Sequence, residues 1–217
     1  MQAFIFDMDG TMVDNMMVHH RAWQLKLKEL GLDLTIEEVK ERCHGKNEEI
    51  IERLFPNKYT PEERYQISFD KEEHYRKVFK DDLKLIDGLE GFLEEAKGAN
   101  IAMGIGTAAP IENINFVLDN LGIRDYFSCV VHAGMVDKGK PDPEVFEKVA
   151  KGLGVSLAES LVFEDSPTGA KTAENAGCPA IILTTTHQEV EFEKFSNIKL
   201  FIKDYTNLTI EQVKNLF

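Results

Sequence analysis

The sequence predicts an α/β protein, with a doubly wound parallel sheet and an all-helical cap inserted after the first strand. Two features of the chain favour this fold. Short apolar runs alternate with helical patterns from residue 101 onward, which is typical of strands that a parallel sheet buries on both faces. Residues 16–80 contain helical patterns and no convincing strand. We therefore expect a Rossmann-like core of residues 1–13 and 82–217, and a helical cap of residues 14–81.

The expected strands are short and end abruptly. The first, over residues 3–6, is unbroken by polar residues, is too short for a helix and is followed directly by Asp7. Four later runs have the same character and are expected to be strands: 101–105, 129–131, 161–163 and 180–183.

Capping residues mark the helices of the expected core. Two dipeptides read as an N-cap followed by a proline at the first helical position: Asp142-Pro143 and Ser166-Pro167. The first of these helices is expected to close at Gly152 or Gly154, and the second at Gly177. This alternation of strand and helix predicts consecutive βαβ units.

The cap segment carries its own helix signals. Trp23, Leu27 and Leu30 recur at helical spacing and are expected to form part of the cap's apolar core. Residues 35–38 and 60–63 both match the capping-box pattern, in which a threonine and a glutamate three residues later satisfy the first turn. Each box predicts the start of a helix.

Composition excludes several classes of protein. The chain has 217 residues, of which 43% are hydrophobic, so it is globular rather than disordered. Its 25 basic and 38 acidic residues give a net charge of −13, which argues against nucleic acid or an anionic membrane surface as a partner. A small anionic substrate stays compatible with this charge, since it needs only a local positive pocket or a metal ion.

The cysteines and the N-terminal segment predict a cytoplasmic protein. Cys43, Cys129 and Cys178 are far apart and form no CxxC pair, which indicates reduced thiols. The N-terminus has no signal-peptide pattern, and no run approaches the roughly 18 apolar residues of a membrane helix. A monomer is expected rather than an obligate oligomer.

Residues able to carry chemistry follow the expected strands. In a doubly wound sheet the carboxyl ends of the strands meet at one edge, where ligands bind. Polar side chains that this rule brings to that edge are Asp7, Asp9, Thr107, Lys140, Glu164 and Asp165.

This set suits phosphoryl transfer. Clustered carboxylates repel each other unless a hard cation such as Mg²⁺ binds, and Mg²⁺ also accepts substrate phosphate oxygens. An aspartate can act as a nucleophile toward phosphorus, while a second one donates and accepts protons. Thr107, with backbone N–H groups of the following turn, can hydrogen-bond a phosphate oxygen, and Lys140 supplies a point charge.

Four short motifs, in this order along the chain, resemble those of the haloacid dehalogenase superfamily. They are Asp7-Met8-Asp9-Gly10-Thr11, Thr107, Lys140-Pro141 and Glu164-Asp165. The segment from Phe6 to Trp23, and the runs beginning at Gly139 and Phe163, resemble its β-phosphoglucomutase-like branch with a helical cap. The likeness spans nearly the whole chain.

The resemblance implies a role for each motif residue. Asp7 would be the nucleophile and Asp9 the acid/base. Mg²⁺ would be held by Asp7, the Asp9 backbone carbonyl and Asp165, and Glu164 would bind the metal or support its site. Four residues are expected to contact the substrate: His19, Lys46, Arg76 and Ala108. Neighbouring helix residues point about 100° apart, so His20 is expected to face solvent when His19 faces the substrate.

One position departs from the branch. Its mutases carry an arginine after a cap glycine, and that arginine holds the second phosphate of a sugar bisphosphate. Here Glu48 follows Gly45 at that position and has the wrong charge, although Lys46 or Arg76 could replace the arginine. The departure favours hydrolysis.

The leading hypothesis is a magnesium-dependent phosphatase or phosphotransferase that acts on a small phosphorylated metabolite through an aspartyl-phosphate on Asp7. A β-phosphoglucomutase is the alternative, and a non-catalytic phospho-switch is a distant one. A haloalkanoic acid dehalogenase is disfavoured, because its chemistry needs neither a metal nor the acid at Asp9.

Overall fold

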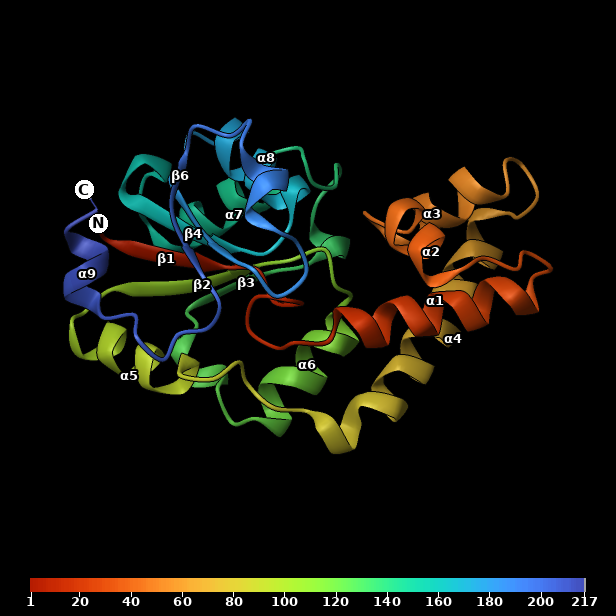
Figure 1. Ribbon diagram of the computed structural model, residues 1–217, viewed down its shortest axis with the longest axis horizontal. Coiled ribbons are helices and arrows are strands. Elements are labelled where there is room, and N and C mark those ends of the chain that lie inside the picture. Colours follow the sequence, from red (N-terminus) through yellow and green to blue (C-terminus); the bar gives the residue numbers. More distant parts are fainter. Residues whose placement is uncertain (217) are drawn as a thin grey trace. The chain divides into compact units, whose positions relative to one another are not determined.

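The computed structural model describes residues 1–216 and divides into two compact units (Figure 1). The first, here called the core unit, comprises Met1–Asp14 and the chain from Lys84 onward. The second, the helical unit, comprises Asn15–Leu83. The division expected from the sequence, after residues 13 and 81, lies within two residues of these boundaries.

A parallel sheet forms the centre of the core unit, as predicted, and it has six strands within residues 1–216. Its spatial order is β3-β2-β1-β4-β5-β6, which is the doubly wound arrangement. The strands are β1 (Ala3–Phe6), β2 (Ala102–Gly106), β3 (Cys129–Val131), β4 (Ser160–Glu164), β5 (Ala180–Leu183) and β6 (Ile198–Ile202).

Strand register decides which residues meet at the carboxyl edge. Phe6 at the end of β1 lies opposite Ile105 of β2 and Phe163 of β4. All four residues of β1 and all five of β4 are buried, so both are central strands. Because these parallel strands are aligned, the residues that follow Phe6, Ile105 and Phe163 emerge side by side.

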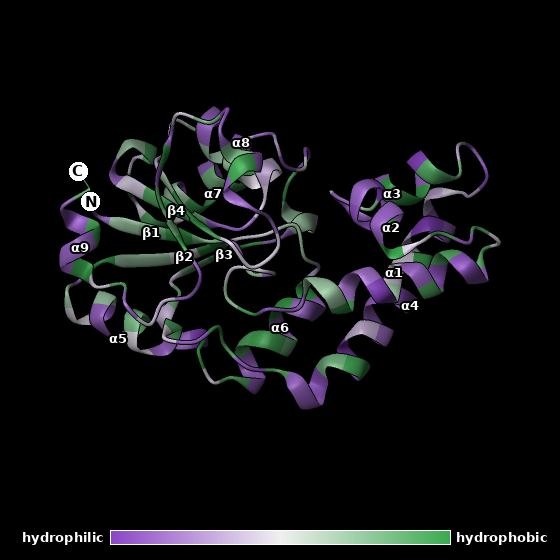
Figure 2. Ribbon diagram, viewed as in Figure 1, coloured by the Kyte–Doolittle hydropathy of each residue, from purple (hydrophilic) through white to green (hydrophobic). Residues whose placement is uncertain are grey.

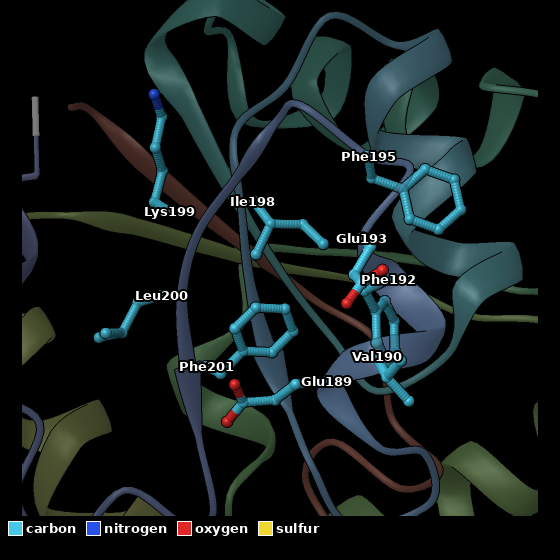
Figure 3. Close-up of a pocket in the computed structure, with 9 residues that line it drawn as sticks. All are labelled: Glu189, Val190, Phe192, Glu193, Phe195, Ile198, Lys199, Leu200 and Phe201. Atoms are coloured by element: carbon cyan, nitrogen blue, oxygen red, sulfur yellow. The ribbon is translucent and has the colours of Figure 1, made fainter.

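The sixth strand is not among the strands expected from the sequence. β6 lies at the edge of the sheet, contains Lys199 and is only half-buried apart from that exposed lysine. It therefore lacks the unbroken apolar run that marks a central strand. A groove of about 350 Å³ lies between β6 and the 3-10 helix η5 (Glu189–Phe192), with Phe192 and Phe201 among its lining residues (Figure 3). None of the expected site residues lines this groove.

Among the described residues, the core unit has five α-helices: α5 (Leu89–Gly98), α6 (Ile111–Asn120), α7 (Glu144–Leu153), α8 (Pro167–Asn175) and α9 (Ile210–Lys214). Their sequences mix hydrophobic and hydrophilic residues along each ribbon (Figure 2). Ser166 caps α8 through its side chain, as predicted, and Gly154 ends α7 in the left-handed conformation. Helix α7 begins one residue later than predicted, with Pro143 as its N-cap, and Asp142 Oδ1 accepts a hydrogen bond from the Glu144 N–H at 3.1 Å.

Four α-helices make up the helical unit: α1 (Met16–Glu29), α2 (Ile36–Arg42), α3 (Asn47–Leu54) and α4 (Pro61–Phe79). Both predicted capping boxes are present, at Thr35 and Thr60. Trp23 and Leu27 are buried in a small apolar core that also contains Val39. Within residues 1–216 no helix has the length and apolar character needed to cross a bilayer.

Candidate active site

Four of the expected site residues come together at the carboxyl edge of the sheet. Asp7 follows β1, Glu164 ends β4, Asp165 follows it, and Lys140 lies in the segment between β3 and α7. One carboxylate oxygen from each of the three acids lies within 4.8 Å of the other two. All three acids are buried.

Lys140 joins two of these acids. Its Nζ donates to Asp7 Oδ1 at 2.8 Å and to Glu164 Oε1 at 2.5 Å. The lysine side chain is 8% exposed, whereas the nearby Lys138 is 76% exposed. Burial lowers the pKa of Lys140, but the Asp7 and Glu164 carboxylates more than offset this and raise it above its ordinary value. Lys140 is therefore a fixed cation beside Asp7.

Glu164 is fully engaged by protein donors. Oε1 accepts from Lys140, and Oε2 accepts from the N–H groups of Asp165 and Ser166 at 2.9 and 3.2 Å and from Ser166 Oγ at 3.1 Å. These contacts fix both Lys140 and the turn that leads into α8. Glu164 therefore connects Lys140 to the backbone of the Asp165-Ser166 turn.

Burial and mutual repulsion raise the pKa values of the aspartates. For Asp7, burial is the largest cause; Lys140 opposes it, and Glu164 and Asp9 add to it. For Asp165, burial is again the largest cause, followed by Glu164 and Asp7. When all three carboxylates are ionised, the single ammonium leaves an excess of two negative charges. The site therefore favours binding of positive charge.

A divalent cation fits this site on its donor atoms. Asp165 Oδ2 is buried and makes no aligned hydrogen bond with the rest of residues 1–216. Such an oxygen is stabilised by a cation or a proton. The donors are all carboxylate oxygens, which hard cations such as Mg²⁺ prefer, and the excess charge of the cluster matches one such ion.

The other expected core-unit residues lie in two loops at the same edge. Asp9 follows Asp7 by two residues, is half-buried and forms an isolated bridge with Val13. Thr107 follows β2 and is buried, and its Oγ1 accepts from the Ala109 N–H at 3.1 Å. Its hydroxyl proton stays available to a ligand. Ala108, in the same turn, is half-buried.

Gly169 determines where Glu164 can lie. A Cβ at Gly169, in the first turn of α8, would come 1.8 Å from Glu164 Cδ. Since four donors hold Glu164, that carboxylate cannot move without breaking the cluster. We expect Gly169→Ala to destabilise the protein by about 1–3 kcal/mol, as overpacking does, in urea denaturation.

Gly91 provides a matched control for this prediction. It also lies inside a helix, α5, but a Cβ there meets nothing within 4 Å. Gly91→Ala should therefore stabilise the protein by up to about 1 kcal/mol. Equal effects of the two substitutions would contradict a steric role for Gly169.

Glu144 holds the loop that precedes Lys140. Its Oε2 accepts from the N–H groups of Asp137 and Lys138, both at 2.9 Å, and its Oε1 pairs with Lys148 at 2.6 Å. The Lys148 hydrogen bond is the main cause that lowers the pKa of Glu144 to about 2, and the Lys138 and Asp137 N–H groups add to it. The loop is thus fixed through one carboxylate.

The lowered pKa of Glu144 predicts a pH dependence of stability. The contribution of the ionised Glu144 carboxylate to folding stability is complete above the ordinary pKa of 4.5. It is lost as pH falls toward 2, because Glu144 takes up its proton at a higher pH in the unfolded chain than in the folded protein. We expect the stability difference between wild type and Glu144→Gln to shrink over that range. A ¹³C NMR titration of the Glu144 carboxyl should give a midpoint well below 4.5, and one near 4.5 would contradict the expectation.

His19 lies in a buried polar cluster of the helical unit. Lys71 Nζ is 2.9 Å from His19 Nδ1 and donates to Glu72 Oε1 at 2.7 Å, and the His19 ring stacks on Tyr75. Because the ammonium of Lys71 can only donate, Nδ1 is the acceptor in this contact. The expectation that His20 faces solvent is wrong, since its side chain is also buried.

Lys71 is the residue of this cluster that sequence reasoning missed. It is only 1% exposed, although lysine is seldom buried without a partner. Its place on α4 gives no local signal, because the charged residues around it read as a solvated helix face.

The other predicted residues of the helical unit lie on two helices. Lys46 is the N-cap of α3, Glu48 is in the first turn of α3, and Arg76 lies in the last turn of α4.

Comparisons with known proteins identify the relatives of this chain. Residues 1–177 match a family described as haloacid dehalogenase-like hydrolase. The chain is 30% identical over 191 residues to β-phosphoglucomutase of Bacillus subtilis, covering 83% of this chain and 82% of that protein. It is 32% identical over 187 residues to the phosphorylated carbohydrates phosphatase of Thermotoga maritima, covering 83% and 84%.

A solved structure gives the same result for the fold. The crystal structure of HAD hydrolase, family IA, variant 3 from Entamoeba histolytica superposes with a TM-score of 0.90 at 28% identity, covering 100% of this chain and 99% of that one. The comparisons therefore include both a mutase and phosphatases among the relatives.

Proposed function

The chain belongs to the haloacid dehalogenase-like hydrolases, and from that premise we propose that it is a magnesium-dependent phosphatase of a small phosphorylated sugar or related ester. The observation that carries the proposal is the buried contact of Lys140 with both Asp7 and Glu164, next to Asp165. This arrangement combines a carboxylate nucleophile, a fixed cation and a place for a metal ion.

In the proposed first step, a carboxylate oxygen of Asp7 attacks the phosphorus of the ester. The bond from phosphorus to the ester oxygen breaks, and Asp9 gives its proton to the departing alkoxide. The product is an aspartyl-phosphate on Asp7. Lys140, 2.8 Å from Asp7 Oδ1, holds that carboxylate in place and offsets charge on the phosphoryl group.

In the second step, water attacks the phosphorus of the aspartyl-phosphate and Asp9 takes up its proton. The bond from phosphorus to Asp7 breaks, and inorganic phosphate leaves. Thr107 and the Ala108 N–H are assigned to phosphoryl oxygens in both steps. Asp7, Asp165 and the Asp9 carbonyl would hold Mg²⁺, whose charge would offset that of the phosphoryl oxygens.

Charges of the helical unit support hydrolysis over mutase activity. A bisphosphate intermediate needs a cation for its second phosphate. Glu48 carries the opposite charge in the first turn of α3, and the buried cation Lys71 is already neutralised by Glu72. Glu72 is held in turn by Asn47, whose Nδ2 donates to its Oε1 at 2.7 Å.

The helical unit is also where we place recognition of the organic part of the substrate. His19 and Lys71 are buried polar groups of a kind suited to hydroxyls of a sugar or polyol. Lys46 and Arg76 stay predictions for this role. The relatives named as carbohydrate phosphatase and β-phosphoglucomutase support a phosphorylated sugar as the substrate class.

One assay with two readouts tests the proposal. The protein is incubated with Mg²⁺, β-glucose 1-phosphate and a catalytic amount of glucose 1,6-bisphosphate. Glucose 6-phosphate is followed by a coupled reaction and inorganic phosphate is measured in parallel. A panel of sugar and polyol phosphates follows in the phosphate assay, because the preferred ester is set by the helical unit.

The two readouts separate phosphatase from mutase. Phosphate in excess over glucose 6-phosphate supports the phosphatase. Glucose 6-phosphate in excess over phosphate would establish the mutase, which the relative from Bacillus subtilis favours as the second candidate. Activity that is unchanged by removal of Mg²⁺ with EDTA would contradict the metal-dependent mechanism.

A further inference from the structure

Three consecutive threonines follow β5 at the carboxyl edge of the sheet. Thr184 continues the strand pairing, since its N–H donates to the Ile202 carbonyl at 2.8 Å. Thr185 turns toward the loop after β1, where its Oγ1 donates to the Gly10 carbonyl at 2.5 Å. This bond ties the end of β5 to the loop that carries Asp7 and Asp9.

Thr186 approaches the same glycine from the side of Asp165. The Cβ position of Gly10 lies 2.1 Å from Asp165 Oδ2 and 3.0 Å from Thr186 Oγ1. Gly10 has a φ of +76°, which glycine adopts readily. Its missing side chain also leaves room for both oxygens. The Asp165 carboxylate and the Thr186 hydroxyl therefore lie on the same side of Gly10.

Both oxygens are buried, and neither makes an aligned hydrogen bond within residues 1–216. A threonine hydroxyl donates one proton, and a carboxylate only accepts. A hydroxyl beside an otherwise unbound carboxylate oxygen is thus its natural donor. Gly10, beside which both oxygens lie, directly follows Asp9, whose carbonyl is a proposed metal ligand.

We propose that Thr186 is a positioning residue for the divalent metal, which it serves by donating a hydrogen bond to Asp165 and fixing the direction of that carboxylate. Thr185 anchors the segment that presents it. The inference rests on the metal site of the proposed function. Outer partners of metal-binding carboxylates commonly change metal affinity about 10- to 100-fold when they are removed.

The test uses Thr186→Val, which keeps the branched shape and removes only the hydroxyl. The full-length protein is freed of metal with EDTA, desalted, and titrated with Mg²⁺ alone by calorimetry. We expect Thr186→Val to raise the Mg²⁺ dissociation constant about tenfold or more, while the melting temperature of the metal-free protein changes little. Thr186→Ser, which restores the donor, should recover the wild-type constant.

Thr184→Val is the matched control, because the Thr184 hydroxyl donates to the Ile202 carbonyl at 3.3 Å and not to the metal cluster. It should leave the dissociation constant unchanged. Equal Mg²⁺ affinity of Thr186→Val and wild type would overturn the inference and leave the proposed function intact. Weaker binding that Thr186→Ser does not restore would overturn it too. A wild-type protein that binds no Mg²⁺ would overturn both.

Discussion

Asp7→Asn is expected to abolish phosphate release, with kcat lowered on the order of 10⁴-fold or more, because the amide cannot form the aspartyl-phosphate. The fold should survive. The asparagine still offers an oxygen to Lys140, and the substitution removes one negative charge from a cluster that has an excess of them. Phosphate release under saturating substrate and thermal unfolding without metal measure the two effects.

Asp9→Asn separates the nucleophile from the acid/base. It keeps Asp7 intact and impairs only proton transfer. With p-nitrophenyl phosphate, whose leaving group needs no proton, Asp9→Asn should still give a burst of p-nitrophenol, whereas Asp7→Asn should give none. A burst from Asp7→Asn would exclude Asp7 as the nucleophile. So would turnover by Asp7→Asn at more than about a hundredth of the wild-type rate.

Lys140→Met should have the second largest effect, on stability as well as on turnover. Removing one partner of a buried ion pair leaves the other uncompensated, which typically destabilises a protein by about 3–5 kcal/mol. Here Asp7 and Glu164 would both lose the cation that lies 2.8 and 2.5 Å from them. Urea denaturation in EDTA should show this loss.

Mg²⁺ should reverse part of that destabilisation. With the lysine gone, the cluster has a larger excess of negative charge, so a divalent ion stabilises the variant more than it stabilises the wild type. Lys138→Met is the control, since the Lys138 side chain is 76% exposed and its substitution should be nearly neutral. A Lys140→Met protein as stable as wild type in EDTA would contradict the structural role of the pair.

The sequence predicts the central part of the fold and the positions of the site residues on it. Strands β1, β2 and β4 are recognisable because each is an apolar run buried on both faces. Their polar successors, such as Asp7 and Thr107, are recognisable because parallel strands end at a common edge. The placement of these residues thus follows from burial and topology.

What the sequence misses depends on long-range contacts. β6 is half-buried at an edge, so its residues do not show the pattern of a central strand. Lys71 is buried only because α1 supplies His19 and α4 itself supplies Glu72. Thr186 could not be singled out because its hydroxyl lies beside Gly10, which is far away in the chain. None of these relations leaves a local signal in composition or periodicity.

The hydrogen bond from the Ile86 N–H to the Met12 carbonyl, at 2.9 Å, closes the core unit on itself at the two points where the helical unit begins and ends. The helical unit is therefore a chain segment inserted between two neighbouring backbone positions of the core unit. Each doubling of the length of such an insert raises the free-energy cost of bringing its ends together by only about 0.6 kcal/mol. A change in the length of the inserted segment therefore costs the core unit little and leaves the ends of its strands in place.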